Sequence, residues 1–294
     1  MVEELPLVSI LITGGTGSFG RAFIKRLLDN AGSERICCFS RGEHTQAEMR
    51  AEMDDDRLRW FIGDVRDRDR LRRAFEGVHT VVHAAALKRI EVGAYNPIEM
   101  VKTNVFGTMN VIEAAMDAGV AKVVALSSDK AYQPISPYGQ TKALMEGLML
   151  QANNMSKFTK FACTRYGNVA GSAGSVIPKW RHYAFRHGPG NKKVTITDPE
   201  CTRFWMTMPE AVDLVLNTIE AMPQEVVIPD LPAFRLGDLA EALGVSCLEP
   251  TGLPFWEKKH EGLTDELQSN TARRMTVAEL RKAAHQLGSL ELWL

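Results

Sequence analysis

Short runs of apolar, often β-branched residues alternate with longer amphipathic stretches through the first 170 residues. Between residues 99 and 118 apolar side chains recur at roughly helical spacing, with a strand-like run on either side. This segment is predicted to be a helix that crosses over between two buried strands. The alternation predicts βαβ units and therefore a parallel sheet. The runs predicted as its strands are VSILIT, RICCFS, LRWFIG, TVVHAA, KVVALS and KFACTR.

After about Gly171 the pattern loosens, because glycine and proline become frequent and only EVVIP stands out as a further strand. Helices are predicted at residues 209–222, where a proline occupies the first turn, and at residues 235–243. The polar tail from about residue 264 has helical character. The fold class predicted is α/β, a doubly wound parallel sheet followed by a smaller C-terminal lobe.

Composition narrows the choice of partners. Hydrophobic residues make up 45% and charged residues 24% of the chain, and the formal net charge is −1. These values are typical of a globular protein and argue against a nucleic-acid or acidic-membrane partner. The five cysteines show no C-x-x-C spacing and mostly lie in apolar runs, which indicates a reducing compartment. With no signal peptide expected at MVEELPLVSI and no apolar run near about 18 residues, we expect a cytoplasmic protein without a metal site.

A glycine-rich segment, TGGTGSFG, follows the first predicted strand and precedes the helical RAFIKRLLDN. Gly14 permits a tight turn, Gly17 lets the backbone approach a pyrophosphate, and Gly20 lets the helix pack close to the sheet. The helix N-terminus then points at the phosphates. The segment predicts a dinucleotide site; the alternative is a glycine-rich turn without a ligand.

The end of the second strand indicates which dinucleotide binds. Folds that hold NAD place an acidic residue there for the ribose 2′-hydroxyl, but this chain has Ser40 and Arg41. A hydroxyl and a guanidinium suit a 2′-phosphate, so NADP is favoured over NAD unless Arg41 is simply a solvated loop charge. Asp64 is placed to bind the adenine amino group. The predicted cofactor-binding residues are Gly14, Thr16, Gly17, Ser18, Phe19, Gly20, Ser40, Arg41, Asp64, Val65, Ala84, Ala85, Ala86, Asn104, Tyr138 and Lys142.

Candidate catalytic residues follow the fifth strand, in SSDKAY and YGQTK. Tyr138 and Lys142 are four residues apart, so a helix places both on one face. Lys142 is expected to hold the nicotinamide ribose and to lower the pKa of Tyr138 from about 10 toward 7, which requires about 4 kcal/mol. Asp129 and Lys130 precede them; the alternative for this pair is a surface ion pair of little energetic value.

Together these motifs resemble the extended short-chain dehydrogenase/reductase family, and within it the inverting UDP-N-acetylglucosamine 4,6-dehydratases of bacterial polysaccharide biosynthesis. The resemblance covers about residues 10–243. It is most specific at Asp129-Lys130 after the serine pair, at RYGNV with the following GSAGSV, and at TRFW. The other shared segments are GGTGSFG, SRGE, FIGDVRD, HAAALK, SSDKAYQP and YGQTK.

The resemblance implies a Rossmann-type NADP-binding domain at residues 1–170, with its last strand from about residues 225–229, and a mainly substrate-binding lobe at residues 171–294. It implies a lyase that oxidises C4 transiently, eliminates water across C5–C6, returns hydride to C6 and inverts C5. Tyr138 would be the redox base, Lys142 its partner, Ser128 the hydroxyl near the sugar 4-oxygen, and Asp129 and Lys130 the acid and base. A UDP-linked sugar as substrate and a homo-oligomer are also implied. The implied substrate-binding residues are Lys88, Asn168, Ser175, Val176, Arg203 and His260.

One segment departs from the family pattern. Members carry R-x-G-E-K-x-H-E near the C-terminus, where the arginine helps to hold the diphosphate; here Pro254 and Trp256 occupy the arginine and glycine positions. Another sugar or nucleotide is therefore an alternative. A 4- or 5-epimerase would use Tyr138, Lys142 and the same cofactor, and a catalytically idle NADP-binding module is a further alternative, because fold alone does not exclude it.

Overall fold

The computed structural model describes residues 9–30, 32–187, 193–245 and 247–287. Its centre is a seven-stranded parallel sheet of order β10-β6-β5-β4-β1-β2-β3. The six strands predicted within residues 1–170 are all present, and EVVIP adds a short seventh at the edge. The strands are β1 (Ser9–Thr13), β2 (Arg35–Ser40), β3 (Leu58–Ile62), β4 (Thr80–His83), β5 (Lys122–Leu126), β6 (Lys160–Thr164) and β10 (Val226–Val227).

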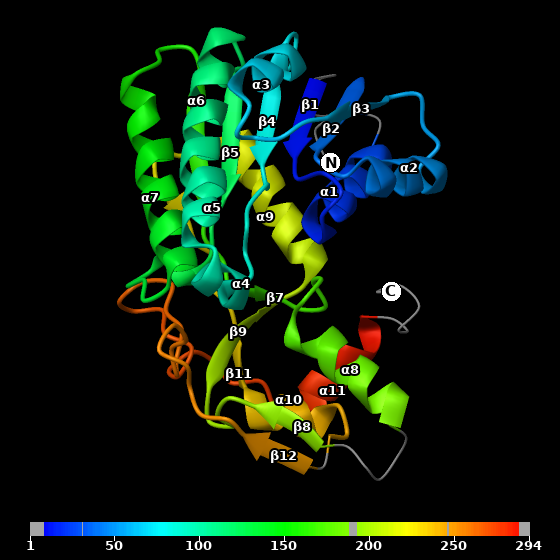
Figure 1. The fold of residues 1–294 in the computed structure, drawn as a ribbon, viewed down its shortest axis with the longest axis vertical. Helices are drawn as coiled ribbons and strands as arrows, with labels where there is room; N and C mark the ends of the chain where they lie inside the picture. Colours follow the sequence, from blue (N-terminus) through cyan, green and yellow to red (C-terminus); the bar gives the residue numbers. More distant parts are fainter. Residues whose placement is uncertain (1–8, 31, 188–192, 246, 288–294) are drawn as a thin grey trace.

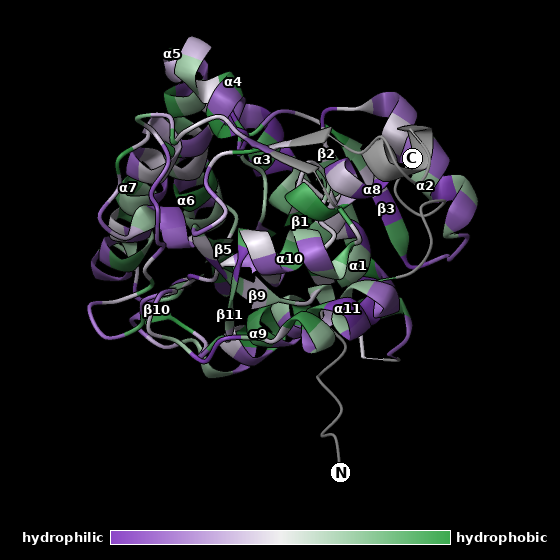
Figure 2. Ribbon diagram, turned by 90° about the horizontal axis from the view of Figure 1, so that it is seen from below, coloured by the Kyte–Doolittle hydropathy of each residue, from purple (hydrophilic) through white to green (hydrophobic). Residues whose placement is uncertain are grey.

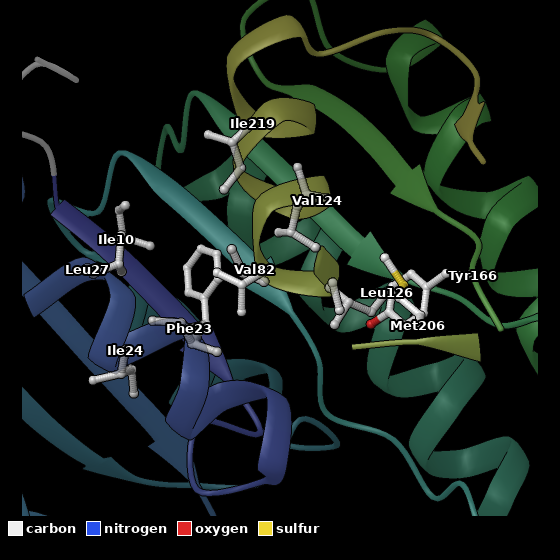
Figure 3. Close-up of a cluster of buried hydrophobic side chains, with 14 of the residues drawn as sticks. Ile10, Phe23, Ile24, Leu27, Val82, Val124, Leu126, Tyr166, Met206 and Ile219 are labelled. Carbon is white, nitrogen blue, oxygen red and sulfur yellow. The ribbon is translucent and has the colours of Figure 1, made fainter. Parts of the chain in front are cut away.

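Helices cover both faces of the sheet, as expected of a Rossmann-type fold. Alternate side chains of β1 enter different cores: Ile10 and Ile12 pack with α1 and α9, whereas Leu11 packs with α3, α6 and α7. Figure 3 shows the first core, with Ile10 and Val82 from the sheet close to Phe23. Seen from the lobe end, α6 and α7 lie on one side of the sheet and α1 and α9 on the other (Figure 2). The helices are α1 (Ser18–Leu28), α2 (Glu43–Glu52), α3 (Arg68–Phe75), α6 (Gly107–Asp117), α7 (Pro137–Gln151) and α9 (Met208–Ala221).

The crossover predicted at residues 99–118 is helical but not uniform. It begins with α4 (Ile90–Tyr95) and α5 (Pro97–Val101), passes through one π-helical turn, η1 (Lys102–Phe106), and continues as α6. Such wider turns occur frequently at functional sites. Here the turn carries Asn104, whose amide is hydrogen-bonded to Leu87 and to Thr141 on α7.

The remaining elements form a lobe beyond the carboxyl ends of the sheet strands (Figure 1). The expectation of a single further strand was wrong, because the lobe has a three-stranded sheet, β11-β9-β7, and a two-stranded one, β12-β8. TRFWM forms β9, and all five of its residues are buried, so it shows no alternation of apolar and polar residues. The lobe elements are β7 (Asn168–Val169), α8 (Val176–His187), β8 (Lys193–Ile196), β9 (Thr202–Met206), β11 (Ala233–Arg235), α10 (Leu236–Ala242), β12 (Cys247–Pro250) and α11 (Val277–Gln286).

Two segments, α9 and residues 254–275, connect the lobe with the large sheet. Helix α9 begins with a capping box between Thr207 and Glu210 and packs back on the large sheet. Residues 254–275, here named the strap, run without helix along the open end of the sheet before α11. Of the described residues from 264 onward, those of α11 have the helical character predicted for this tail. No helix among the described residues combines the length and apolarity needed to span a membrane.

Candidate active site

A cleft of about 1210 Å³ lies between the carboxyl ends of the sheet strands and the lobe. This is where open α/β sheets bind ligands. Its lining gathers most residues predicted from the sequence, from both the cofactor and the catalytic sets. They are Gly14, Thr16, Gly17, Ser18, Phe19, Gly20, Ser40, Arg41, Asp64, Val65, Ala84, Ala85, Ala86, Lys88, Ser128, Asp129, Lys130, Tyr138, Lys142, Asn168, Ser175 and Arg203.

The glycine-rich turn has the shape of a phosphate cradle. Gly14 has a φ of +70°, and a Cβ added there would lie 2.9 Å from the backbone of Ala85. Gly17 is the N-cap of α1 and no side chain caps that helix, so the first amide groups of α1 remain available to an anion. These features fit a dinucleotide pyrophosphate.

The end of the cleft at the tip of β2 is where the adenosine of a dinucleotide is expected. It carries hydrogen-bond donors, Ser40 and Arg41, in place of a carboxylate. Buried Gln46 donates to Ser40 Oγ at 2.9 Å, and the Ser40 hydroxyl also forms a hydrogen bond with Cys38. The Arg41 side chain is 58% exposed and lies 3.9 Å from Asp64. Asp64 is held by Arg66, and these two arginines keep its pKa low although burial acts to raise it. The sequence gives no indication that Gln46 is buried and holds Ser40, because it is one glutamine in a polar helix.

The catalytic cluster forms where a 3₁₀ turn, η2 (Asp129–Ala131), meets the start of α7. Ser128 caps this turn, Ser136 caps α7, and the Asp129 amide donates to the carbonyl of Tyr166. The two elements touch at Gly139, where an added Cβ would lie 2.2 Å from the Lys130 carbonyl oxygen. This close approach brings Tyr138 beside Ser128 and Lys130.

Burial shifts the pKa of both Tyr138 and Lys142. The Lys142 ammonium donates to the Leu126 carbonyl at 2.6 Å, and burial lowers its pKa to about 8. Burial raises the pKa of Tyr138 to about 12; a hydrogen bond with Ser128 and the charge of Lys130 act against this, and Asp129 adds to it. Lys130 is therefore a cation that favours the Tyr138 phenolate.

Asp129 is buried and Lys130 is only 16% exposed, so their interpretation as a surface ion pair is wrong. Lys130 Nζ lies 3.0 Å from both carboxylate oxygens of Asp129 and 3.3 Å from Glu261 on the strap. Burial raises the pKa of Asp129, and the charge of Glu261 adds to this against the effect of Lys130. Burial acts to lower the pKa of Lys130, but the two carboxylates outweigh it and the net shift is upward. Glu261 thus acts to raise the pKa of both Asp129 and Lys130.

The strap and β9 supply the other wall of the cleft. Arg203 is buried, pairs with Glu257 at 2.5 Å and donates to the Lys259 carbonyl. Pro254 and Trp256, the two departures from the family segment, both line the cleft. Trp256 packs edge-to-face on Phe255 with ring centroids 4.6 Å apart.

Three predicted site residues do not line the main cleft. The Asn104 amide is occupied within the fold as described above, and the His260 ring pairs with the Thr202 hydroxyl at 2.8 Å. Val176 lines an adjoining cavity of about 790 Å³, whose apolar wall includes Trp180, Trp205 and Phe234. Conversely, Arg89, Lys179 and Glu261 line the cleft without having been predicted; Glu261 lay in the matched HE pair, but its approach to Lys130 depends on tertiary structure. No group of three potential metal ligands occurs among the described residues.

Comparison with known proteins agrees with this geometry. The chain is 44% identical over 257 residues to a UDP-N-acetylglucosamine 4,6-dehydratase (inverting) of Campylobacter jejuni, with 86% of this chain and 76% of that protein covered. It is 42% identical over 241 residues to a UDP-glucose 4-epimerase of Rickettsia bellii, with 80% and 70% covered.

Solved structures agree in fold. The X-ray structure of Pen from Bacillus thuringiensis has a TM-score of 0.90 at 32% identity, covering 97% of this chain and 99% of that one. The dTDP-glucose 4,6-dehydratase DesIV of Streptomyces venezuelae has a TM-score of 0.79 at 21% identity, with 94% and 96% covered, and shows the same fold. The polysaccharide biosynthesis protein family model matches residues 10–278, beyond the span that the motifs indicated. This chain therefore belongs to the polysaccharide biosynthesis protein family, within the extended short-chain dehydrogenase/reductase fold.

Proposed function

We propose that this protein is a nucleotide-sugar 4,6-dehydratase, a lyase that acts on UDP-N-acetylglucosamine and inverts C5. The observation that carries the proposal is the buried Asp129–Lys130 pair at the end of β5, beside Tyr138 in the cleft. An acid and a base next to a redox tyrosine are what an elimination that follows C4 oxidation requires. The inverting dehydratase of Campylobacter jejuni, at 44% identity, supports the same reaction.

The nucleotide cofactor that we propose is NADP. The glycine cradle at Gly14 and Gly17 would hold its pyrophosphate, and Ser40 with Arg41 would bind a 2′-phosphate. The Lys142 ammonium lies at the end of β5, next to the Leu126 carbonyl, where it would bind a nicotinamide ribose. When bound, the cofactor would supply the hydride acceptor for C4 in its oxidised form and the hydride donor for C6 in its reduced form. The absence of a carboxylate at the tip of β2 favours NADP over NAD.

Tyr138 is a phenol at rest, because its pKa is raised to about 12, and it must lose its proton before the phenolate takes the proton of the C4 hydroxyl. Ser128 hydrogen-bonds to Tyr138 and also donates to Asp129 at 2.8 Å. Asp129 gives its proton to the departing C6 oxygen. The proton taken from O4 then has a route through Ser128 to the Asp129 carboxylate, which returns both Tyr138 and Asp129 to their starting states.

Lys130 takes the C5 proton once C4 is a ketone, because the carbonyl makes that hydrogen acidic. The raised pKa of Asp129 suits its role as the acid. The raised pKa of Lys130 means that the resting ammonium must lose a proton before it acts as a base. A later protonation of C5 from the opposite face would invert that centre.

The substrate is placed by complementary surfaces. The apolar cavity beside Trp180 and Trp205 suits a uracil base, and it opens into the main cleft through Asn168, Ser175 and Arg203, which line both. Lys179 also lines both cavities and Lys88 lines the main cleft, where a diphosphate would lie. These lysines would supply the positive charge for a diphosphate, because Pro254 occupies the position at which members of the family carry an arginine.

We also propose a cytoplasmic homo-oligomer. Large apolar side chains are exposed along the crossover and α7: Ile98 is 68%, Phe106 53% and Leu144 51% accessible. An exposed apolar patch of this kind is typical of an interface. Because this patch lies on the crossover and α7, we propose that its partner is a second copy of this chain.

The proposed cytoplasmic location agrees with four buried free cysteines, which are typical of a reducing compartment.

Incubation with UDP-N-acetylglucosamine in deuterated water tests the function, with the sugar analysed by mass spectrometry and NMR. Loss of water with deuterium at C5 is the expected result, and the proton couplings would report the C5 configuration. Unchanged sugar would contradict the proposed substrate. Inversion at C4 or C5 without loss of water would instead support the second candidate, an epimerase, which the 42% identity to a UDP-glucose 4-epimerase favours.

A further inference from the structure

Two buried carboxylates face one ammonium in the cleft. Lys130 lies 3.0 Å from Asp129 and 3.3 Å from Glu261 Oε1. Glu261 is 2% exposed, and its second oxygen, Oε2, accepts no hydrogen bond among the described residues; it lies 3.6 Å from the Lys258 ammonium. A buried carboxylate oxygen without a hydrogen-bond donor lowers stability, which indicates a role other than holding the fold together.

The strap fixes Glu261 in this place through contacts on both sides. The Glu261 amide donates to Ser269 Oγ, and the Ser269 amide donates back to the Glu261 carbonyl, both at 2.8 Å. Arg165 donates to the Leu263 carbonyl at 2.6 Å and pairs with Glu146 on α7. Because α7 also carries Tyr138, the strap and the catalytic helix are tied together.

The charged groups around Asp129 and Glu261 indicate different roles for these two carboxylates. Lys130 and Asp129 come from η2, Tyr138 from α7, Arg203 from β9, and Glu261 with Lys258 from the strap. If Asp129 were the only carboxylate at Lys130, it would be ionised as the counter-ion and could not also serve as the acid. A second carboxylate removes this conflict.

We propose that Glu261 is a positioning residue for the elimination, the counter-ion and proton acceptor of Lys130, and that it thereby leaves Asp129 protonated. The inference rests on the proposed dehydratase function. A proton passes from the Lys130 ammonium to the Glu261 carboxylate, which gives a neutral amine and a neutral carboxyl. The amine takes the C5 proton, and Asp129 releases its own to the C6 oxygen. C5 is protonated again from the opposite face, and the Lys130–Glu261 pair releases its extra proton to solvent and returns to its starting charge.

The pH profile of dehydration tests this role in the Glu261→Gln variant. Without the second negative charge, the pKa values of both Asp129 and Lys130 fall, so both limbs of the bell-shaped profile move to lower pH. The rate at neutral pH should fall at least about 100-fold, the lower end of what a positioned acid–base group contributes. Glu261→Asp, which keeps the charge, should restore the profile and part of the rate. Glu266→Gln, an exposed change on the same strap, should match the wild type; a slower Glu261→Gln with an unmoved profile would overturn the proposal.

Infrared spectroscopy of the purified proteins separates this proposal from the dehydratase assignment, because it needs no turnover. The wild type should show the band of a buried protonated carboxyl near neutral pH, and Asp129→Asn should remove it. In Glu261→Gln this band should disappear at a lower pH than in the wild type, whereas Glu261→Asp should behave as the wild type does. A band missing from the wild type, or one that titrates identically in Glu261→Gln, would refute the role of Glu261 whatever sugar the enzyme uses.

Discussion

The ammonium of Lys142 lies 2.6 Å from the main-chain carbonyl of Leu126, at the carboxyl end of the strand that leads into the catalytic turn. The lysine is buried among β5, β6 and α7, where only this carbonyl and the Met145 sulfur accept its hydrogen bonds in the described structure. A cation in such a place is kept at the expense of stability, as expected of a group that serves a ligand.

Lys142→Met should therefore stabilise the cofactor-free protein. The folded-state pKa of about 8 is below the usual value of 10.5, so the unfolded chain binds the proton more tightly and the cost of burial is fully present below pH 8. A shift of this size corresponds to about 3 kcal/mol. Thermal melts should show the largest gain at pH 7 and a shrinking gain as the pH rises toward 10.5. A gain that does not vary with pH would contradict the burial of a charged lysine.

Arg41→Ala should weaken NADP much more than NAD. Loss of a charge-assisted hydrogen bond to a 2′-phosphate costs about 1.5–3 kcal/mol, or roughly 10- to 100-fold in affinity. Calorimetric titration with both dinucleotides measures the ratio. Arg50→Ala, an exposed arginine of α2, is the matched control and should leave the ratio unchanged, whereas equal losses for both dinucleotides in Arg41→Ala would remove the 2′-phosphate assignment.

Lys130→Ala should abolish elimination and leave the cofactor bound. The change removes the amine that takes the C5 proton, so deuterium should no longer enter C5 from solvent. The loss of dehydration should exceed about 100-fold, while the affinity for NADP stays close to that of the wild type. A variant that still dehydrates at the wild-type rate would exclude Lys130 from the mechanism.

Two glycines of α7 should respond in opposite ways to alanine. At Gly139 the new methyl group would meet the Lys130 carbonyl oxygen at 2.2 Å, so the catalytic turn must move, and both dehydration and thermal stability should fall. At Gly147 nothing lies within 4 Å, and alanine should stabilise the helix by about 0.5–1 kcal/mol. Activity assays and melting curves of the two variants decide the matter; a harmless Gly139→Ala would show that this contact does not position the turn.

Leu144→Glu should dissociate the homo-oligomer, because a carboxylate at the centre of an apolar interface loses its hydration. Sedimentation velocity measures the change. Phe158→Glu places the same charge on a residue that is 65% exposed but lies beyond the end of α7, and it should sediment as the wild type does. A monomeric wild type would contradict the proposed assembly.

The sequence predicted those parts of the molecule whose signals are local. The parallel strands were recognisable from their apolar runs, the cofactor turn from its glycines, and the catalytic cluster from residues 128–142, which are close in the chain. Strand β9 was missed because its five residues are buried on both faces. The position of Glu261 depends on hydrogen bonds from Arg165 and Ser269, partners that no periodicity reveals, and the burial that changes the pKa of Lys142 and Asp129 is likewise a property of the tertiary structure.

The strap is joined to the catalytic helix by Arg165 but lies about 120 residues further along the chain. The counter-ion proposed for Lys130 therefore comes from a different segment of the polypeptide than Tyr138, Asp129 and Lys130. Substitutions on the strap can change the charge beside Lys130 and leave Tyr138 and the glycine turn intact. This modular arrangement offers a short evolutionary route between dehydratases and epimerases built on the same scaffold.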